Sequence, residues 1–218
     1  MVDGRKCKAE LPAIIAAGVV LFSGTAMAQP MLDLTVNNTA GGSQTFSGAA
    51  IGPGISDLSA SGTLGGYEFE LAATATDGNG LDELFEVSIN TSVVQSPAGR
   101  LEFDLVGSGY TGFSGPTQAG SEVTPSSVDG DLDVETSVGG TTVLDAEDLS
   151  TSVDASDSRL VSLTSPYSIR HFSEVEQGSL GDTTTFDTTT AVPAPATIGL
   201  LGAGLLGLGI AARRRVDT

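Results

Sequence analysis

The middle of this chain is built from short runs in which apolar and polar residues alternate. The clearest run spans 67–75, where Tyr67, Phe69 and Leu71 alternate with Glu68 and Glu70. A period of two is typical of strands that bury one face and expose the other. Similar runs lie at 32–36, 85–90, 101–105 and 131–138. The pattern therefore predicts a mostly β domain.

Glycine pairs separate several of these runs. Gly65-Gly66 and Gly139-Gly140 each sit between two apolar runs, where a two-residue loop would join them. Glycine adopts positive φ without strain, and tight hairpin turns require positive φ. Many short strands with glycine-rich turns, and no long helical period outside the termini, are typical of packed antiparallel sheets. We expect an acidic antiparallel β-sandwich over residues 29–173.

The alternating pattern fades after residue 173. Residues 182–190 form an imperfect repeat, in which an aspartate is twice followed by three threonines. Tracts of Thr and Asp with little apolar content bury too little surface to offset the entropy of ordering the chain. We therefore predict that residues 174–191 form an extended Thr/Asp-rich linker.

The N-terminus carries the three parts of a secretory signal peptide. Basic residues occur within 5–8, an apolar run occupies 11–22, and Ala26-Met27-Ala28 follows. Small residues at the first and third positions of such a triplet are typical of signal peptidase sites. We predict that residues 1–28 are a signal peptide and that Ala26 and Ala28 direct cleavage.

The C-terminus combines a proline motif, an apolar run and a basic cluster. Val192-Pro193-Ala194-Pro195 precedes residues 196–212, which contain no charged side chain, and Arg213-Arg214-Arg215 follows. A helix over the apolar run would reach about 26 Å, at the short end of what a bilayer core needs. Arginines after such a run favour the cytoplasmic face. The pattern predicts one C-terminal transmembrane helix.

These parts, in this order, resemble the PEP-CTERM sorting signal of Gram-negative bacteria. The resemblance covers residues 192–215: Val192, Pro193 and Pro195 match the family's Val-Pro-Glu-Pro motif, and Ala194 stands where glutamate is usual. It implies recognition by an exosortase, cleavage near the prolines, transfer to the cell surface and a link to exopolysaccharide and biofilm. The alternative is a plain membrane anchor that is retained uncleaved.

Acidic residues dominate the charge of the chain. It has 27 Asp and Glu against 9 Lys and Arg, a formal net charge of −18, one histidine and no tryptophan. Such a field repels nucleic acid and anionic lipid and attracts divalent cations. The one cysteine, Cys7, lies in the predicted signal peptide. The mature domain therefore has no disulfide and no thiolate metal site.

Two acidic segments offer oxygen ligands for calcium, a hard cation. In the first, four carboxylates at every second position would share one face of a strand. In the second, a short Gly- and Asn-containing loop carries several oxygens. The candidate ligands are Asp129, Asp131, Asp133 and Glu135, and Asp77, Asn79, Asp82 and Glu83. A solvated strand face and a tight turn are the interpretations that the pattern favours, and calcium is the alternative.

No catalytic constellation is recognisable. The lone His171 has no cysteine or second histidine with which to bind zinc, and no Gly-x-Ser-x-Gly motif occurs. We expect a non-enzymatic structural or adhesive protein with no cofactor apart from calcium. Its expected partners are signal peptidase, exosortase, the membrane before processing and extracellular polysaccharide, but no nucleic acid.

Two alternative functions remain at this stage. One is a surface carbohydrate-binding module, and the other, less favoured, is an enzyme that acts on polysaccharide. The candidate sugar-binding platform of the module is Tyr67, Tyr110, Phe113 and Tyr167.

Overall fold

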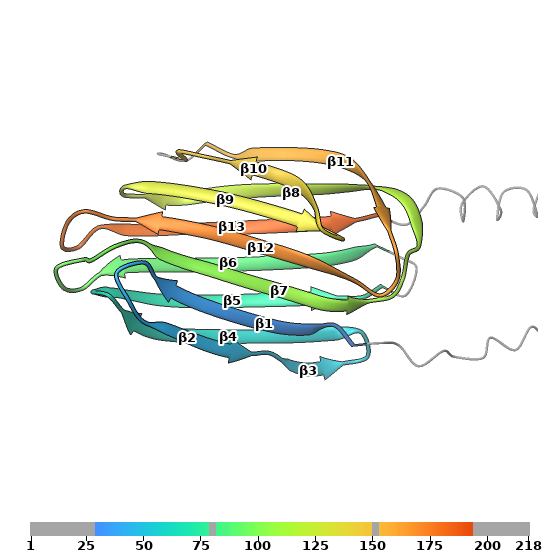
Figure 1. The fold of residues 1–218 in the computed structure, drawn as a ribbon, viewed down its shortest axis with the longest axis horizontal. Helices are drawn as coiled ribbons and strands as arrows, with labels where there is room; N and C mark the ends of the chain where they lie inside the picture. The colour runs from blue at the N-terminus through green and yellow to red at the C-terminus, as the bar shows by residue number, and fades with distance from the viewer. Residues whose placement is uncertain (1–28, 79–81, 150–152, 194–218) are drawn as a thin grey trace, which may run out of the picture.

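The computed structural model describes residues 29–78, 82–149 and 153–193. These residues form two antiparallel sheets packed face to face, which confirms the predicted sandwich (Figure 1). The strand order is β10-β9-β12-β7-β1-β2 in the six-stranded sheet and β11-β8-β13-β6-β5-β4-β3 in the seven-stranded sheet. Within the described ranges, no helix is long and apolar enough to cross a membrane.

The strands are short, as the alternating runs predict. The six-stranded sheet contains β1 (Met31–Asn38), β2 (Ser43–Ser47), β7 (Leu101–Tyr110), β9 (Asp131–Val138), β10 (Thr141–Ala146) and β12 (Tyr167–Glu176). The seven-stranded sheet contains β3 (Ala49–Gly52), β4 (Ile55–Leu64), β5 (Tyr67–Thr76), β6 (Glu83–Val93), β8 (Gly115–Val128), β11 (Ala155–Leu163) and β13 (Thr183–Val192). Each of the five alternating runs lies in a strand.

The core lies between the inner faces of the two sheets. On β5, Tyr67, Phe69 and Leu71 are buried, whereas Glu68 and Glu70 point to solvent. The Phe69 ring packs edge to face against Phe103 of the opposite sheet, with ring centroids 5.8 Å apart. Such aromatic pairs add about 0.5–1.5 kcal/mol beyond the burial of their area. In a chain with few aromatics, these rings hold the sheets together.

The two glycine pairs form the predicted hairpin turns. Gly65 and Gly66 join β4 to β5 with φ of 60° and 91°, and Gly139 and Gly140 join β9 to β10 with φ of 57° and 78°. All four residues lie in the left-handed region that side chains with a Cβ avoid. The turns therefore depend on glycine at these positions.

The prediction of a linker over residues 174–191 is wrong. β12 continues to Glu176, a short turn follows, and β13 then runs from Thr183 to Val192. β13 pairs with β6 on one side and with β8 on the other, near the middle of the seven-stranded sheet. The folded domain therefore extends to the start of the proline motif.

Threonine explains the error. Thr184, Thr188 and Thr190 point into the core beside Phe186, and all are buried. Threonine is β-branched, so its side chain suits a pleated sheet, and its methyl group packs like part of a valine. The Thr190 hydroxyl lies 3.0 Å from that of Ser121 on β8, which satisfies it inside the core. Composition alone counts these threonines as polar and so does not predict that they are buried in a strand.

The two described termini lie at the same end of the sandwich. β1 begins and β13 ends there, at the right in Figure 1. We call this the terminal end; it also carries the loops β3–β4, β5–β6, β7–β8, β9–β10 and β11–β12. The opposite, far end carries the loops β1–β2, β4–β5, β6–β7, β8–β9, β10–β11 and β12–β13.

A pair of neighbouring substitutions tests the place of β13. Phe186→Ala removes a fully buried ring, so we expect the free energy of unfolding to fall by about 3–5 kcal/mol. Asp187→Ala, on the exposed face of the same strand, should change it by less than about 0.5 kcal/mol. Urea denaturation of both variants measures these changes. If both substitutions change the free energy of unfolding by the same small amount, the segment is not a buried strand.

Candidate functional site

The folded domain ends inside the predicted sorting signal. Val192 is the last residue of β13, is 0% exposed and lies opposite Glu83 of β6. The Pro193 carbonyl accepts a hydrogen bond from the Thr117 hydroxyl at 3.2 Å. The first half of the proline motif is thus held by neighbouring strands. The other predicted processing residues, Ala26, Ala28, Ala194, Pro195, Arg213, Arg214 and Arg215, lie outside the described residues.

The N-terminal junction is equally close to the fold. Gln29, which would follow the predicted cleavage site, donates a side-chain hydrogen bond to the Gly52 carbonyl at 2.6 Å. Pro30 is buried, and its carbonyl accepts a hydrogen bond from the Ser56 hydroxyl. Both predicted processing junctions therefore adjoin ordered strands at the terminal end.

A buried carboxyl pair stabilises the loops of the terminal end. Asp77 and Glu83 are 3% and 0% exposed, at the two sides of the β5–β6 connection. Asp77 accepts hydrogen bonds from the Thr111 amide and hydroxyl at 3.2 and 3.0 Å. Glu83 accepts one from the Gly112 amide at 3.0 Å. The two carboxyl groups thus tie the β7–β8 loop to the seven-stranded sheet.

The pair holds a proton at neutral pH. Burial, and then the negative charge of Asp77, raise the pKa of Glu83 to about 8. A side-chain hydrogen bond between Glu83 and Asp77 acts in the same direction. Burial, followed by the charges of Glu83 and Asp77, also raises the pKa of the Tyr110 phenol. The two carboxyl groups therefore link buried loops and do not face solvent as acids.

The loop that was a candidate for calcium is a connection between paired strands. β5 and β6 are adjacent antiparallel strands, and the segment that joins them contains residues 79–81, which lie outside the described residues. Asp77 faces Thr111 and Asp82 is exposed, whereas Asn79 lies outside the described residues. Within the described ranges, no three Asp, Glu or His side chains group in a way that could hold a metal ion.

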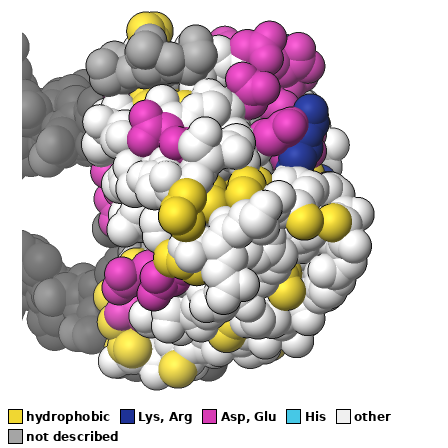
Figure 2. All heavy atoms as spheres, turned by 90° about the vertical axis from the view of Figure 1, so that its left-hand side faces the viewer, with side chains coloured by type: hydrophobic (Ala, Val, Ile, Leu, Met, Phe, Trp, Pro, Cys, Tyr) yellow, Lys and Arg dark blue, Asp and Glu magenta, His cyan; other side chains and the backbone are white. Residues whose placement is uncertain are grey.

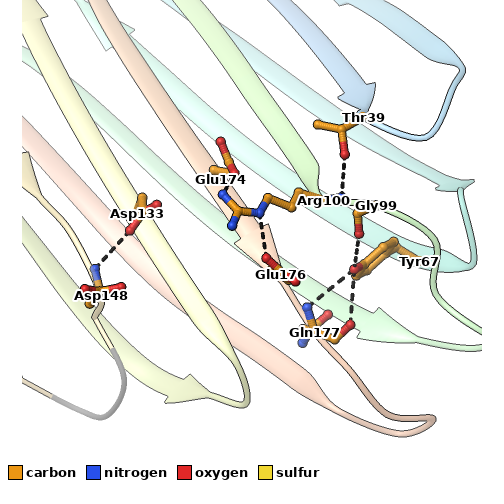
Figure 3. A network of polar contacts seen from close by, with 9 residues as sticks. All are labelled: Thr39, Tyr67, Gly99, Arg100, Asp133, Asp148, Glu174, Glu176 and Gln177. Atoms are coloured by element: carbon orange, nitrogen blue, oxygen red, sulfur yellow. Dashed lines mark hydrogen bonds and ion pairs between the residues drawn. The ribbon is translucent and has the colours of Figure 1, made fainter.

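The second acidic segment lies only partly on one face. Asp131, Asp133 and Glu135 occupy the outer face of β9, but Asp129 precedes the strand and accepts a hydrogen bond from the Thr183 amide at 3.0 Å. Asp133 accepts one from the Asp148 amide at 2.9 Å (Figure 3). The carboxylates of this segment are therefore directed to different partners.

The outer face of the six-stranded sheet is acidic beyond β9. Asp131 lies opposite Glu176 of β12, and Asp133 lies opposite Glu174. Arg100, just before β7, bridges Glu174 and Glu176, the latter at 2.6 Å (Figure 3). Figure 2, which views the far end, shows carboxylates gathered around basic side chains. Exposed ion pairs of this kind add little stability, but they reduce repulsion between neighbouring strands.

The aromatic platform proposed for sugar binding is contradicted. Tyr67, Tyr110, Phe113 and Tyr167 are all buried, at most 6% exposed. The Tyr67 hydroxyl donates to the Gly99 carbonyl at 2.8 Å (Figure 3), and Tyr110 stacks on Tyr167 at 5.7 Å. A chain with few large apolar side chains places its rings in the core, where they bury the most surface. They present no ring to a sugar.

His171 is also part of the core. It is 0% exposed, points inward from β12 and lies 6.1 Å from the Phe186 ring, centroid to centroid. Burial lowers its pKa to about 3, so the imidazole is neutral at physiological pH. Neither ring nitrogen has a hydrogen-bond partner among the described residues. The buried, unpaired ring nitrogens therefore lower the stability of the fold, and the imidazole is not exposed as a reactive group.

An open groove adjoins the C-terminal junction on the outer face of the seven-stranded sheet. Its volume is about 500 Å³. The lining residues are Gly120, Ser121, Glu122, Ser156, Asp157, Ser158, Thr189, Ala191 and Pro193. The alternation of apolar and polar residues does not reveal this groove. The groove forms where Gly120 of β8 lies between β11 and β13, and this placement depends on strand pairing.

Comparison with protein families bears on this junction. Residues 191–215 match the model of the PEP-CTERM protein-sorting motif. This chain carries a PEP-CTERM protein-sorting motif. The match agrees with the resemblance read from residues 192–215 and implies export, exosortase processing and a surface or extracellular location in a Gram-negative bacterium. A comparison with curated proteins finds no match.

Three solved structures are distantly similar to this chain. The PA14 sugar-binding domain of an RTX adhesin is 12% identical, with a TM-score of 0.35, covering 74% of this chain and 90% of its own. The PA14 domain of the antifreeze protein MpAFP is 9% identical, with a TM-score of 0.30, covering 72% and 78%. Infectious bursal disease virus, Gx strain, is 12% identical, with a TM-score of 0.30, covering 77% and 57%. No ligand follows for this chain.

Glu83 gives the fold a pH dependence that an isosteric variant should remove. Because the folded state binds its proton between about pH 4.5 and 8 and the unfolded state does not, Glu83 makes the domain less stable as pH rises through this window. Glu83→Gln keeps the hydrogen bonds without titrating. We expect the free energy of unfolding of this variant to rise relative to that of the parent between pH 5 and 8. The rise should be about 1.4 kcal/mol for each unit by which the pKa of Glu83 in the folded state exceeds that in the unfolded state.

Denaturant titrations at several pH values measure this difference. Asp82→Asn, which neutralises the exposed carboxylate of the same loop, is the matched control. Parallel stability curves for Glu83→Gln and the parent across this window would contradict the proton-bearing pair.

His171 should have the opposite effect. Its folded pKa of about 3 lies below its ordinary 6.5, so the unfolded state gains a proton first and stability falls as pH drops below about 6.5. His171→Leu removes the titrating, unpaired ring from the core. We expect this variant to gain stability over the parent progressively from pH 6.5 to 4, as followed by thermal unfolding. A constant difference across that range would refute it.

Proposed function

We propose that this protein is exported, processed at both ends, and displayed on the cell surface or released into the extracellular matrix, where its domain has a structural or adhesive role. The observation that carries the proposal is the PEP-CTERM motif at residues 191–215, which continues directly from β13 of a folded acidic sandwich. Signal peptidase acts after Ala28, and an exosortase acts near Val192-Pro193-Ala194-Pro195. The apolar run that follows is the membrane anchor before processing.

The chemistry of the domain supports a non-enzymatic role. Its one histidine is neutral and enclosed in the core, and its buried carboxyl pair is engaged in joining loops. These groups contribute to the integrity of the fold, and none faces the groove beside Pro193. The domain acts as a stable, soluble unit whose outer surface makes the contacts.

The acidic outer face is the surface that we assign to matrix contact. Asp131, Asp133 and Glu135 face outward beside Glu174 and Glu176. Arg100 pairs with both of these glutamates, and Arg170 lies close enough to Glu135 to interact with its charge. A dense anionic surface attracts divalent cations, which can bridge it to acidic extracellular polysaccharide. Calcium in this role is loosely shared along the face and is not enclosed by a fixed set of ligands. Nucleic acid, itself polyanionic, is not a partner.

Intact mass of the protein recovered from the cell envelope and the medium tests the proposal. We expect a chain that begins at Gln29 and ends near Pro195, without the apolar run and Arg213-Arg214-Arg215. Ala194→Glu restores the residue usual in the motif and should raise the processed fraction. A species that keeps Arg213 to Thr218 in both fractions would leave a plain anchor and remove the exosortase step.

Two controls separate processing from folding. Pro193→Ala and Pro195→Ala together should reduce the processed fraction. The unfolding curve of the domain should stay close to that of the parent, because the Thr117 hydroxyl bonds to the carbonyl of residue 193, which alanine retains. Asp187→Ala, on the exposed face of β13, should be processed normally.

A further inference from the structure

The space between the folded domain and the membrane is unusually short. The domain continues to Val192, and Pro193 is tied to Thr117, so only Ala194 and Pro195 precede the apolar run that begins at residue 196. Two extended residues reach at most about 7 Å. If the run is inserted, as the proposed function requires, the terminal end must lie against the bilayer surface.

The N-terminal attachment lies at the same end but is longer. Gln29 is bound to Gly52 and Pro30 is buried, and residues 23–28 separate them from the apolar run 11–22 of the predicted signal peptide. Both termini leave from the terminal end in Figure 1. A precursor that still carries its two apolar segments is therefore attached to the membrane through one end of the sandwich.

Charge is distributed unevenly between the two ends. Among the described loop residues of the terminal end, Asp82 is the one exposed charged side chain, since Asp77 and Glu83 are buried. The far end, which faces the viewer in Figure 2, is rich in carboxylates. In the described ranges, the charged residues of its loops and strand ends are Arg100, Asp129, Asp131, Glu147, Asp148, Asp154, Glu176 and Asp182. Anionic lipid repels the far end far more strongly than the terminal end.

Apolar side chains are exposed at both ends. Val94, Val153 and Leu180 lie in loops of the far end, among its carboxylates, whereas the two at the terminal end have few charges near them. Met31 and Ile51 are 63% and 62% exposed, at the start of β1 and on β3. The hydrogen bond from Gln29 to Gly52 holds these two segments together at one corner. Side chains of this kind lose little on entering the headgroup region, where water is scarcer. Two further loops of this end, 139–140 and 164–166, contain only Gly, Pro, Ser and Thr.

We propose that the terminal end is a membrane-docking surface, on which the unprocessed precursor rests against phospholipid headgroups. This rests on the proposed function, because it needs the C-terminal apolar segment to be inserted. Docking holds Ala194-Pro195 at the membrane surface, where a membrane-embedded protease works, and points the acidic far end away from the lipid. The buried, protonated state of Glu83 fits this role, because it removes a charge from the docking surface.

Fluorescence quenching from lipid headgroups tests the surface. The full-length chain with Cys7→Ser is reconstituted into vesicles of phosphatidylethanolamine and phosphatidylglycerol that carry a headgroup nitroxide. A bimane label is placed at Ile51→Cys on the terminal end or at Leu180→Cys on the far end, both exposed apolar positions. The ends are about 30 Å apart along strands of ten residues. We expect the label at 51 to lose most of its fluorescence and that at 180 to keep it.

Added charge provides a second, matched comparison. Thr141→Asp with Thr164→Asp places two carboxylates on exposed positions of the terminal end, and Ser96→Asp with Ser179→Asp does so at the far end. The first pair should restore fluorescence at position 51 at low salt and lose this effect at high salt, because lipid repulsion is screened. The far-end pair should leave the quenching unchanged.

The outcomes separate this surface from the function on which it rests. A chain that does not float with the vesicles overturns the anchored intermediate, and the docking surface with it. A chain that floats, but whose two labels are equally quenched or equally bright, leaves anchoring in place and refutes the docking surface. Insensitivity of position 51 to the terminal-end charges refutes it as well.

Discussion

The pairing of β13 between β6 and β8 is the constraint on which the rest of the structure depends. Without this strand the seven-stranded sheet would divide into a β3–β6 part and a β8–β11 part. The strand also supplies Phe186, one of the largest buried side chains, to the interface between the sheets. Backbone groups on both sides of β13 are satisfied by its neighbours, so its removal would expose two unpaired strand edges. The same strand leads directly into the sorting motif, so the fold and the processing signal meet at Val192.

The core that forms around β13 includes polar groups as well as apolar ones. His171, Thr136, Ser173 and Thr188 are buried, and each has side-chain atoms without a hydrogen-bond partner among the described residues. Unpaired buried polar atoms cost free energy, so the core is less stable than its size suggests. Glu83 and His171 change the free energy of unfolding in opposite directions as pH rises. Their contributions offset one another between about pH 4.5 and 6.5. These two groups therefore favour the folded state most in mildly acidic surroundings.

Exposed negative charge is distributed unevenly between the two ends of the sandwich. The acidic outer face of β9 and β12 continues into the far end, whereas the carboxylates of the terminal end are mostly buried. The chain's overall negative charge would repel an anionic membrane if it were spread evenly. Its concentration away from the termini is what the proposed docking of the precursor on lipid requires. The PEP-CTERM motif and the charge pattern thus fit one another, although they occupy different parts of the chain.

Local patterns in the sequence determined most of the strands, both glycine hairpins and the sorting motif. These features depend on alternation, on the need for positive φ and on a compact linear signal, all of which are legible within about ten residues. Burial depends on which distant strands become neighbours, so it was decided by the tertiary structure. It turned the threonines of 183–190 into a central strand, the proposed aromatic platform into core, and Asp77 and Glu83 into a buried pair. Composition could not distinguish these outcomes, because a threonine or carboxyl group that is costly in isolation becomes acceptable once a partner across the sheet satisfies it.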